Sequence, residues 1–289
     1  MARKLIVNAD GFGFTYGNNR GILETLEIGI VKSISVNVNF PAVEEIHTVV
    51  EKFPRVSIGI HLNLTVGKPV SAPSKIPSLV DDDGCFFPSS RFKKMLLMRK
   101  IKKDDIKREL EAQIEKLLSM SVNITHWDSH QNQHLNPGFF SPAIEVVQKY
   151  KIQRMRTHRH YLLTTKRNRK SAICKYYANN PKTFVLHGVA RYLNRLARKK
   201  GVRMADRILS PGRVDNMKKF QRETWENLFR TLPEGINEVY CHPGYPDDCL
   251  RKYATYTEER DSERIILTDI DLLKFALDCS VELISFNDI

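Results

Sequence analysis

Short runs rich in β-branched residues alternate along the chain with stretches in which apolar residues recur at helical spacing. Runs of the first kind predict strands at 4–8, 34–38, 56–62, 123–128, 153–157, 237–241 and 281–286. Helical spacing predicts helices at 18–30, 42–52, 103–120, 138–150, 217–231 and 268–279. Alternation of strands and helices over this length favours a parallel sheet. We therefore predict an α/β fold, an irregular (β/α) barrel of parallel strands with the helices outside, similar to a TIM barrel.

Two regions interrupt this alternation. Residues 66–102 contain many prolines and the run Asp81-Asp82-Asp83-Gly84, which indicates an insertion or a long loop. Residues 158–215 are basic and rich in Tyr and Asn. We expect a single domain over residues 1–289, with insertions at about 66–102 and 158–215.

The second of these regions contains an amphipathic helical pattern. Val185, Val189, Leu193 and Leu196 fall on one face, and arginines border that face. Such a helix can lie on a membrane surface or form a lid. Peripheral membrane contact through 184–200 is therefore one expectation, and packing of this helix against the barrel is the alternative.

The composition is that of a globular protein with an ordinary core, because 42% of the residues are hydrophobic and 27% are charged. No apolar run approaches the roughly 18 residues that a membrane span requires. The start of the chain lacks the apolar stretch and cleavage site of a signal peptide. The five cysteines are scattered and lack CxxC spacing, which predicts free thiols in a reducing compartment. We expect a cytoplasmic protein, or one peripheral to the inner face of the membrane.

The formal net charge of +13 indicates an anionic partner. Much of the positive charge lies between Arg154 and Arg207. Nucleic acid would suit it, but the chain has no helix-turn-helix, zinc-finger spacing or aromatic RNA-binding motif, so we expect no nucleic-acid partner. An anionic substrate or an anionic membrane surface fits equally well. A solvated basic face without a special role is the remaining interpretation.

Four strand-like runs each end in residues that bind metals or carry protons. Asp10 follows the first run, His61 ends the run from 56, the segment 125–130 holds several such groups, and His242 ends the run from 237. In a βα barrel the carboxyl ends of the strands converge on one mouth, where such folds carry their chemistry. A single aspartate or histidine of this kind is most often structural. Four together predict a hydrolytic site that uses a divalent metal.

The segment from residue 125 carries the densest group of such side chains. His126, Asp128 and His130 share one face of a strand, because side chains alternate with a period of two, and His134 follows. Neutral imidazoles are common zinc ligands, and a nearby carboxylate can orient the ring. A histidine titrates near neutrality, so His242 can donate a proton to a leaving group.

In this order the motifs resemble those of the YdjC-like carbohydrate deacetylases, the family that includes chitooligosaccharide deacetylase. The opening strand of that family ends in a motif close to Asn-Ala-Asp-Asp-Phe-Gly, and here it reads Asn8-Ala9-Asp10-Gly11-Phe12-Gly13. The other segments that resemble the family lie at 16–22, 59–65, 67–69, 125–130, 155–156 and 241–244. The resemblance implies a metal-dependent hydrolase that removes the acetyl group from an N-acetylated amino sugar.

The resemblance also implies roles for individual residues. Asp10 takes the place of the family's catalytic base, and His242 takes that of its proton donor. The metal ligands of the family map to Gly11, His61 and His130. A divalent metal is implied, either zinc or magnesium, although Gly11 puts its occupancy in question.

Two positions depart from the family pattern. Gly11 has no side chain that could coordinate a metal, and Asn132 stands where a histidine usually follows. Three outcomes are open. Asp10 enters the coordination sphere itself, or Asp128, His134, Asn132 or water completes the site, or the chain binds a glycan without hydrolysing it.

The basic stretch bears on the substrate. A sugar that carries a phosphate, a nucleotide diphosphate or a polyprenyl diphosphate would meet Arg156 and Arg159 favourably. We therefore predict an N-acetylated sugar substrate, phosphate- or lipid-linked, and a homodimer is a further expectation. The rival functions are a catalytically impaired carbohydrate-binding homologue and a nucleic-acid or membrane-surface binder that uses residues 158–207.

Overall fold

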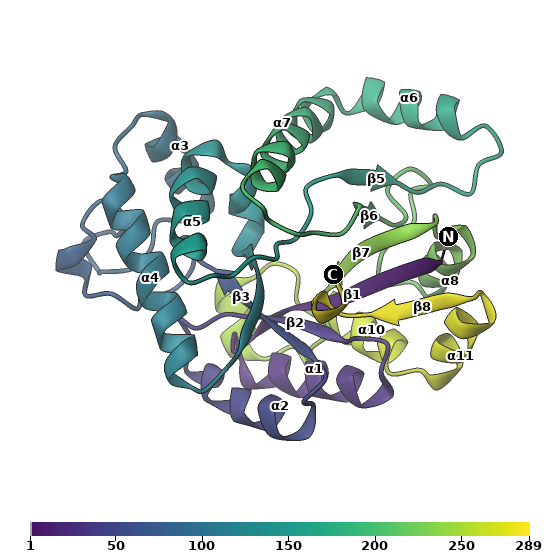
Figure 1. Cartoon of the computed structure of the whole chain (residues 1–289), viewed down its shortest axis with the longest axis horizontal. Coiled ribbons are helices and arrows are strands. Elements are labelled where there is room, and N and C mark those ends of the chain that lie inside the picture. The colour runs from purple at the N-terminus through teal and green to yellow at the C-terminus, as the bar shows by residue number, and fades with distance from the viewer. Residues whose placement is uncertain (1) are drawn as a thin grey trace.

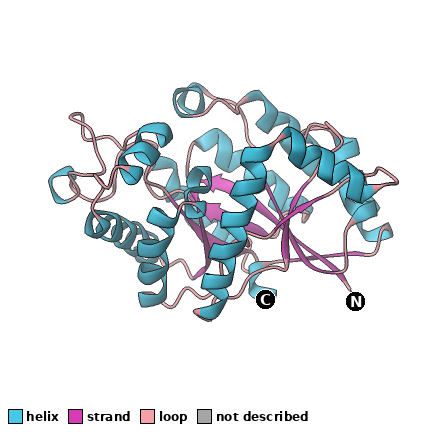
Figure 2. Cartoon of the chain, turned by 90° about the horizontal axis from the view of Figure 1, so that it is seen from above, coloured by secondary structure: helices cyan, strands magenta, loops and turns pink. Residues whose placement is uncertain are grey.

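The computed structural model describes residues 2–289 and shows one sheet of parallel strands. The strands run in the order β4-β3-β2-β1-β7-β6-β5, and β8 also pairs with β1. Their bounds are β1 Arg3–Phe12, β2 Ser33–Val36, β3 Ser57–Leu62, β4 Ile124–Ser129, β5 His160–Leu162, β6 Arg207–Ser210, β7 Gly235–Cys241 and β8 Val281–Ile284. The strands run through the middle of the molecule with helices on both sides (Figure 2).

The long strand β1 lies at the centre of the sheet. Its first residues pair with β7 and β8, and its last residues pair with β2. From Leu5 to Phe12 every residue is buried. Burial on both faces is usual for parallel sheets, because helices cover both of their sides. Apolar residues such as Val7 therefore pack under helices, and the polar residue Asp10 at the carboxyl end must find partners inside the protein.

The two ends of the sheet approach each other through isolated bridges. Trp127 of β4 bridges Met155, and Arg154 bridges Arg203. This extended segment lies where the strand 153–157 was predicted, and it leads from β4 toward β5. It almost closes the sheet into an irregular barrel. The predicted fold class, an α/β fold of parallel strands with helices outside, is confirmed.

Helices cover the sheet on all sides (Figure 1). Their bounds are α1 Tyr16–Ile28, α2 Ile46–Lys52, α3 Ser89–Leu97, α4 Lys103–Ser119, α5 Pro137–Lys149, α6 Arg169–Asn179, α7 Pro181–Lys199, α8 Arg222–Thr231, α9 Asp248–Tyr253, α10 Glu258–Leu267 and α11 Ile270–Asp278. Short 3-10 turns are η1 Pro41–Glu45, η2 Pro73–Lys75, η3 His130–Leu135 and η4 Phe286–Asp288. None of the helices within residues 2–289 has both the length and the hydropathy needed to cross a bilayer.

Several elements were not predicted. Strands β5 and β6 are short, and helices α3, α6, α9 and α10 carry too few regularly spaced apolar residues to stand out. The helix predicted at 217–231 begins only at Arg222. Tertiary contacts, and not local periodicity, specify such elements.

The two expected insertions differ in their relation to the sheet. Residues 66–102 form η2, α3 and an antiparallel bridge between Val80 and Phe86, all outside the sheet. Residues 158–215 contain α6 and α7, but they also supply β5 and β6 of the sheet itself. Only the helical part of the second region is therefore additional to the barrel.

Candidate metal and catalytic site

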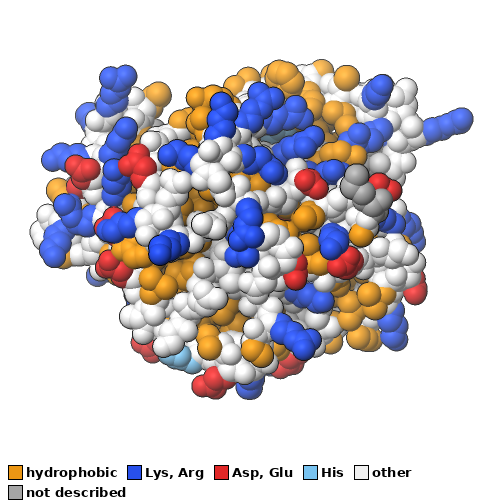
Figure 3. Space-filling view, viewed as in Figure 1, with side chains coloured by type: hydrophobic (Ala, Val, Ile, Leu, Met, Phe, Trp, Pro, Cys, Tyr) orange, Lys and Arg blue, Asp and Glu red, His pale blue; other side chains and the backbone are white. Residues whose placement is uncertain are grey.

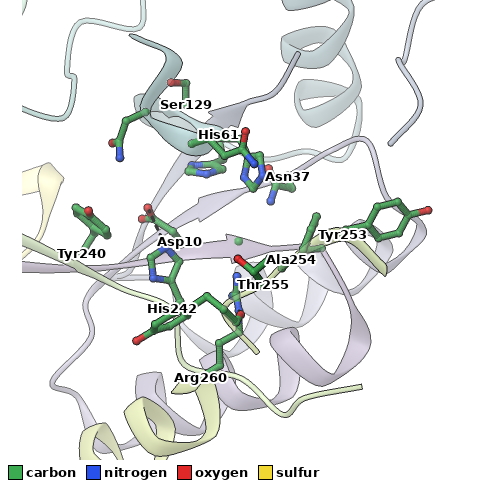
Figure 4. Close-up of a pocket in the computed structure, with 16 residues that line it drawn as sticks. Asp10, Asn37, His61, Ser129, Tyr240, His242, Tyr253, Ala254, Thr255 and Arg260 are labelled. Carbon is green, nitrogen blue, oxygen red and sulfur yellow. Dashed lines mark hydrogen bonds and ion pairs between the residues drawn. The ribbon is translucent and has the colours of Figure 1, made fainter. Parts of the chain in front are cut away.

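Four predicted site residues face one cavity at the carboxyl ends of the strands (Figure 4). Asp10 comes from β1, His61 from β3, His130 from η3 directly after β4, and His242 from the turn after β7. In the close-up, Asp10 lies between His61 and His242. The cavity has a volume of about 320 Å³. Its wall also contains Gly11, Phe14, Asn37, Ser129, Gln131, Asn132, Tyr240, Tyr253, Ala254, Thr255, Tyr256 and Arg260.

A buried guanidinium holds the two aspartates of the site. Arg156 donates from Nη1 to Asp10 Oδ2 at 2.8 Å and from Nη2 to Asp10 Oδ1 at 2.5 Å. The same Nη2 lies 2.6 Å from Asp128 Oδ2, and Nε donates to Glu238 Oε1 at 3.0 Å. Burial raises the pKa of the aspartates, but the charge of Arg156, together with hydrogen bonding and the neighbouring His61, lowers the pKa of both Asp10 and Asp128 below the usual value. Both are therefore carboxylates near neutral pH.

Asp128 orients the imidazole of His61. Its Oδ1 lies 2.6 Å from His61 Nδ1, and its Oδ2 accepts a hydrogen bond from Ser35 Oγ at 3.0 Å. Because Nδ1 is engaged by the carboxylate, Nε2 is the ring nitrogen left for a ligand. One donor atom from each of Asp10, His61 and Asp128 lies within 4.8 Å of the others, so this buried group could hold a metal ion.

Gly11 is the extra residue of a β-bulge next to Asp10. The register with β2 pairs Asp10 with Ser35 and Phe12 with Val36, which leaves Gly11 between the two pairs. Its φ is +99°, a conformation that residues with a Cβ adopt only under strain. A Cβ at this position would lie 3.2 Å from Asn18 Nδ2, 3.8 Å from Arg260 Nη1 and 3.9 Å from Asn37 Nδ2. An arginine and two asparagines thus surround the place where a side chain would begin.

Asn37 lines the cavity and has an unsatisfied side-chain oxygen. The residue directly follows β2, and its backbone N–H donates to the carbonyl oxygen of Phe12 at 2.8 Å, which holds it beside the bulge. Only 1% of the residue is exposed. Its Oδ1 is buried, and it accepts no hydrogen bond within residues 2–289. Buried acceptors of this kind are rare in native structures and point to a bound ion or water.

The donors on this cavity wall fit a divalent metal. The rings of His61 and His130 are 5.5 Å apart between centroids and nearly perpendicular, at 77°. Burial, together with the neighbouring His61 and Arg260, lowers the pKa of His130 to about 3, so its ring is neutral and has a lone pair to offer. Two imidazoles and the Asn37 oxygen form a mixed nitrogen and oxygen set, which suits zinc or a related transition metal.

His242 faces the cavity in its neutral form. Its side chain is 28% exposed, and its Nε2 lies 4.0 Å from Asp10 Oδ2. Desolvation and the charge of Arg260 lower the pKa of His242 well below its usual value, although Asp10 opposes this shift. The backbone N–H of His242 donates to Glu263 Oε2 at 2.5 Å, which fixes the turn after β7.

Arg260 of α10 carries a charge with no close carboxylate partner. It is 6% exposed, and it donates from Nε to the Tyr256 carbonyl oxygen at 2.9 Å and from Nη1 to Asn18 Oδ1 at 3.3 Å. Within residues 2–289, no carboxylate oxygen lies within 4.0 Å of its guanidinium. Burial lowers the pKa of Arg260. A second cavity, also about 320 Å³, shares Arg260 and His242 with the first and is lined further by Arg213, Lys218 and Lys219.

These residues were missed at the sequence level. Arg260 lies in a helix that is mostly charged and was not predicted, and Asn37 is one polar residue after a short strand. Neither position carries a local motif. Only the packing of α10 and β2 against the end of β1 shows that both belong to the site.

Some predicted site residues lie elsewhere. Asn132 lines the cavity, but His134 does not, because it is buried against Ser129 Oγ at 2.5 Å and stacks on His158. Arg159 is exposed, and the wall of neither cavity includes Arg159 or Arg156. The guanidinium of Arg156 is already occupied by carboxylates.

His126 is packed inside the barrel, below the site. Its ring stacks on Phe286 with centroids 3.8 Å apart. A Cβ on the neighbouring Gly59 would lie only 2.3 Å from His126 Nε2, so a glycine is required there for close approach. Burial lowers the pKa of His126 to about 3, in keeping with a neutral structural histidine.

The sequence matches one protein family, described as YdjC-like protein, over residues 4–277. A carbohydrate deacetylase of Thermoanaerobacter pseudethanolicus is 32% identical over 286 residues, which cover 98% of each chain. A carbohydrate deacetylase of Geobacillus stearothermophilus is 30% identical over 291 residues, covering 100% of this chain and 98% of that one.

Solved structures agree with the fold. An Enterococcus faecalis protein, provisionally described as a cellobiose-phosphate cleavage protein, superposes with a TM-score of 0.79 at 25% identity, covering 100% of this chain and 99% of the other. A lactam utilization protein from Thermus thermophilus reaches a TM-score of 0.50 at 12% identity, with 98% and 99% coverage. The second likeness concerns the fold alone.

Proposed function

Because the chain belongs to the YdjC-like family, we propose that it is a metal-dependent deacetylase that removes the acetyl group from an N-acetylated amino sugar. The observation that carries this proposal is the convergence of Asp10, two neutral imidazoles and His242 on one cavity. The names of the similar carbohydrate deacetylases support the reaction. The donor set on the cavity wall supports metal dependence.

His61 and His130 would hold the metal. Their nitrogen atoms favour zinc or another transition metal over magnesium. When bound, such a metal polarises an amide carbonyl and acidifies water. Asp128 would orient the ligand His61, because its hydrogen bond to His61 Nδ1 fixes the ring and its tautomer and leaves Nε2 to bind the metal.

Proton transfer falls to Asp10 and His242. Arg156 keeps Asp10 ionised, so this carboxylate can accept the proton of the attacking water. His242 is neutral at rest, and its Nε2 lies 4.0 Å from Asp10 Oδ2, so a proton can reach the imidazole. The resulting imidazolium is stabilised by Asp10 and can protonate the departing amine.

The second cavity supports a substrate with an anionic group. Arg213, Lys218, Lys219 and Arg260 line it, and Glu263 is the acidic member of the wall. A phosphate on the sugar, free or lipid-linked, would be attracted there while the acetamido group lies in the first cavity. We assign this role to the second cavity because Arg156 is occupied by carboxylates.

The test is acetate release from N-acetylglucosamine conjugates with and without a phosphate. Asp10→Asn and His242→Ala should each lower turnover by about 10²–10⁴-fold, the usual contribution of an acid–base group. Their thermal stability serves as the control for folding. Unchanged turnover in either variant would contradict the assignment. A Michaelis constant that rises with salt for the phosphorylated sugar alone would support the second cavity.

The competing function is a carbohydrate-binding homologue without catalysis. Gly11 favours it, because the position supplies no ligand and the charge of Arg260 lies beside it. That function predicts sugar binding without acetate release, and little metal in the purified protein. Elemental analysis and the acetate assay on one preparation distinguish the two functions.

A further inference from the structure

The carboxamide of Asn37, whose oxygen is unsatisfied, stands beside Gly11, where the resemblance to the family leads us to expect a ligand. Asn37 Nδ2 lies 3.9 Å from the place of a Cβ on Gly11, and the residue lines the same cavity as His61 and His130. From this juxtaposition we infer that the side-chain oxygen of Asn37 is the third protein ligand of a metal held by His61 and His130. The inference deepens the proposed function, because it concerns the same site.

The two carboxylates near this metal position, those of Asp10 and Asp128, are already engaged. Both oxygens of Asp128 are used, by His61 Nδ1 and by Ser35 together with Arg156. Both oxygens of Asp10 accept from Arg156, and Oδ1 accepts also from Asn8. A cation competing for these carboxylates would have to displace a buried guanidinium. Asn37 Oδ1 is free of such competition.

His134 and the other amide side chains on the cavity wall are poorer candidates than Asn37 for the third metal ligand. His134 is bonded to Ser129 and does not line the cavity. Asn132 and Gln131 also line the cavity, but Asn132 is only partly buried and Gln131 is exposed, so water can satisfy both amides. A buried acceptor without a donor is unfavourable, and a cation satisfies it as a hydrogen bond would. Amide oxygens are ordinary ligands of divalent cations, weaker than carboxylates because they are neutral.

Zinc affinity, measured by competition with a chromophoric chelator on the full-length protein, tests this inference without using activity. Asn37→Leu keeps the approximate size and removes the oxygen, and it should weaken Zn²⁺ binding at least tenfold. Asn37→Asp supplies a charged oxygen and should tighten it. Asn39→Leu is the matched control, because Asn39 lies two residues further on and outside the cavity wall, and it should leave the affinity unchanged.

The outcomes separate this inference from the proposed reaction. Equal Zn²⁺ affinity in the wild type and Asn37→Leu overturns it, as does a wild type that binds no Zn²⁺. If Asn37→Leu does not fold, failure of Asn37→Asp to bind more tightly than the wild type overturns it. A wild type that binds Zn²⁺ through Asn37 but releases no acetate supports the ligand and refutes the deacetylase.

A second, independent observation concerns the outer surface of α6 and α7. Four apolar side chains at this surface are exposed, with Phe184 at 62%, Val185 at 64%, Leu186 at 44% and Tyr192 at 59%. Hydrophobic side chains gather there along the upper edge of the molecule, with Lys and Arg side chains among them (Figure 3). We propose that this α6–α7 surface docks on an anionic lipid bilayer.

The positive charge of the segment that contains α6 and α7 favours an anionic bilayer as the partner of this surface. Residues 146–205 contain no aspartate or glutamate and carry many lysines and arginines, among them Lys182, Arg191 and Arg195 near the exposed apolar side chains. A second copy placed symmetrically on this surface would set like charges against each other. Basic and apolar side chains together suit the interface of an anionic membrane. The expected membrane contact through 184–200 thus becomes a proposal about a defined surface.

The exposed apolar side chains of α7 lie on the face of the helix that does not pack against the rest of the domain. Ala190, Leu193 and Ala197 are buried against the domain. A hollow of about 640 Å³ next to α7 is lined by Val185 and Leu186 and also by Asn132 and Tyr240 of the catalytic cavity wall. Docking of the α6–α7 surface would therefore bring the approach to the site close to the lipid headgroups.

Vesicle co-sedimentation of the full-length protein tests the docking. The wild type should bind phosphatidylcholine vesicles that contain phosphatidylglycerol at least tenfold more strongly than pure phosphatidylcholine vesicles. The double variant Phe184→Ser with Val185→Ser should lose this binding. Leu277→Ser should retain it, because Leu277 is 58% exposed on α11, which lies well away from α6 and α7 (Figure 1).

Two results overturn the docking proposal. One is equal binding of the wild type and the double variant to the anionic vesicles, or no binding by either. The other is a dimer in light scattering that the double variant converts to a monomer, because the surface would then be an interface between copies. Neither result depends on the deacetylase reaction.

Discussion

Gly11→Asp adds a carboxylate at the position where the resemblance to the YdjC-like family leads us to expect a metal ligand. The substitution also strains the backbone, because the φ of residue 11 is +99°. Such strain costs on the order of 1–3 kcal/mol. The new carboxylate lies near Arg260 Nη1, which is 3.8 Å from the Cβ position. A hydrogen bond to this charged group should offset about 1.5–3 kcal/mol.

The matched control is Gly11→Ala, which carries the same backbone strain without the carboxylate. Gly11→Asp should therefore be more stable than Gly11→Ala by about 2 kcal/mol, the value of a hydrogen bond to a charged group. For a chain of this size 1 kcal/mol corresponds to roughly 2–4 °C in melting temperature, so the difference should be about 4–8 °C. Both variants should unfold cooperatively if the bulge is retained.

Zinc affinity and acetate release complete the assay. Gly11→Asp should bind Zn²⁺ at least about tenfold more tightly than the wild type, since even an outer-shell partner contributes about 10–100-fold. Gly11→Ala should show no gain. Equal Zn²⁺ affinity in the two variants would refute the reasoning, because residue 11 would then lie outside the metal site.

Three further predictions follow from the packing and charge of the interior. Gly59→Ala should lower the free energy of unfolding by about 1–3 kcal/mol through overpacking, because its Cβ would lie 2.3 Å from His126 Nε2. Urea titrations measure this loss, and Gly188→Ala is the control. A Cβ on Gly188 would have no atom within 4 Å, so this variant should not lower the free energy of unfolding. Arg156→Met should destabilise the fold by about 3–5 kcal/mol by leaving buried carboxylates unpaired, and a loss under about 1 kcal/mol in the same titration would contradict the network. The folded protein lowers the pKa of Asp10 below its ordinary value of 3.8, so the ionised carboxylate stabilises the fold at pH values above 3.8. The difference in unfolding free energy between the wild type and Asp10→Asn should therefore shrink as the pH falls below 3.8. A difference that stays constant with pH in denaturation experiments would show that the carboxylate contributes nothing.

Local sequence patterns were sufficient for the strands that carry chemistry. The runs before Asp10, His61 and His242 were all predicted as strands, and they form β1, β3 and β7. Strands β3 and β7 begin and end within two residues of the predicted bounds, whereas β1 continues four residues further, to Phe12. Strand β5 has three residues and α10 is largely charged, so neither has a periodicity that stands out from its surroundings. These elements depend on contacts with residues far away in the chain, which no local window contains.

In the candidate site, too, some features could be predicted from local sequence and others depend on contacts between distant segments. Parallel strands present their carboxyl ends to one edge, so the meeting of Asp10, His61 and His130 could be predicted from strand ends. The position of Arg156 could not, because a basic residue in a basic segment gives no sign that it is buried. Its side chain was expected to meet substrate, yet it holds the carboxylates of Asp10 and Asp128.

The sequence by itself determined the fold class and the kinds of side chain at the mouth of the barrel, because hydrophobic periodicity and residue identity are local properties. Only the tertiary structure decided which of these groups are free to act. Burial and charge pairing arise between segments such as β2, the extended segment that contains Arg156, and α10, which are remote in sequence. Among residues 2–289, they leave Asn37 with an unsatisfied oxygen and Arg260 without a close carboxylate, and the positive φ at position 11 favours the glycine found there.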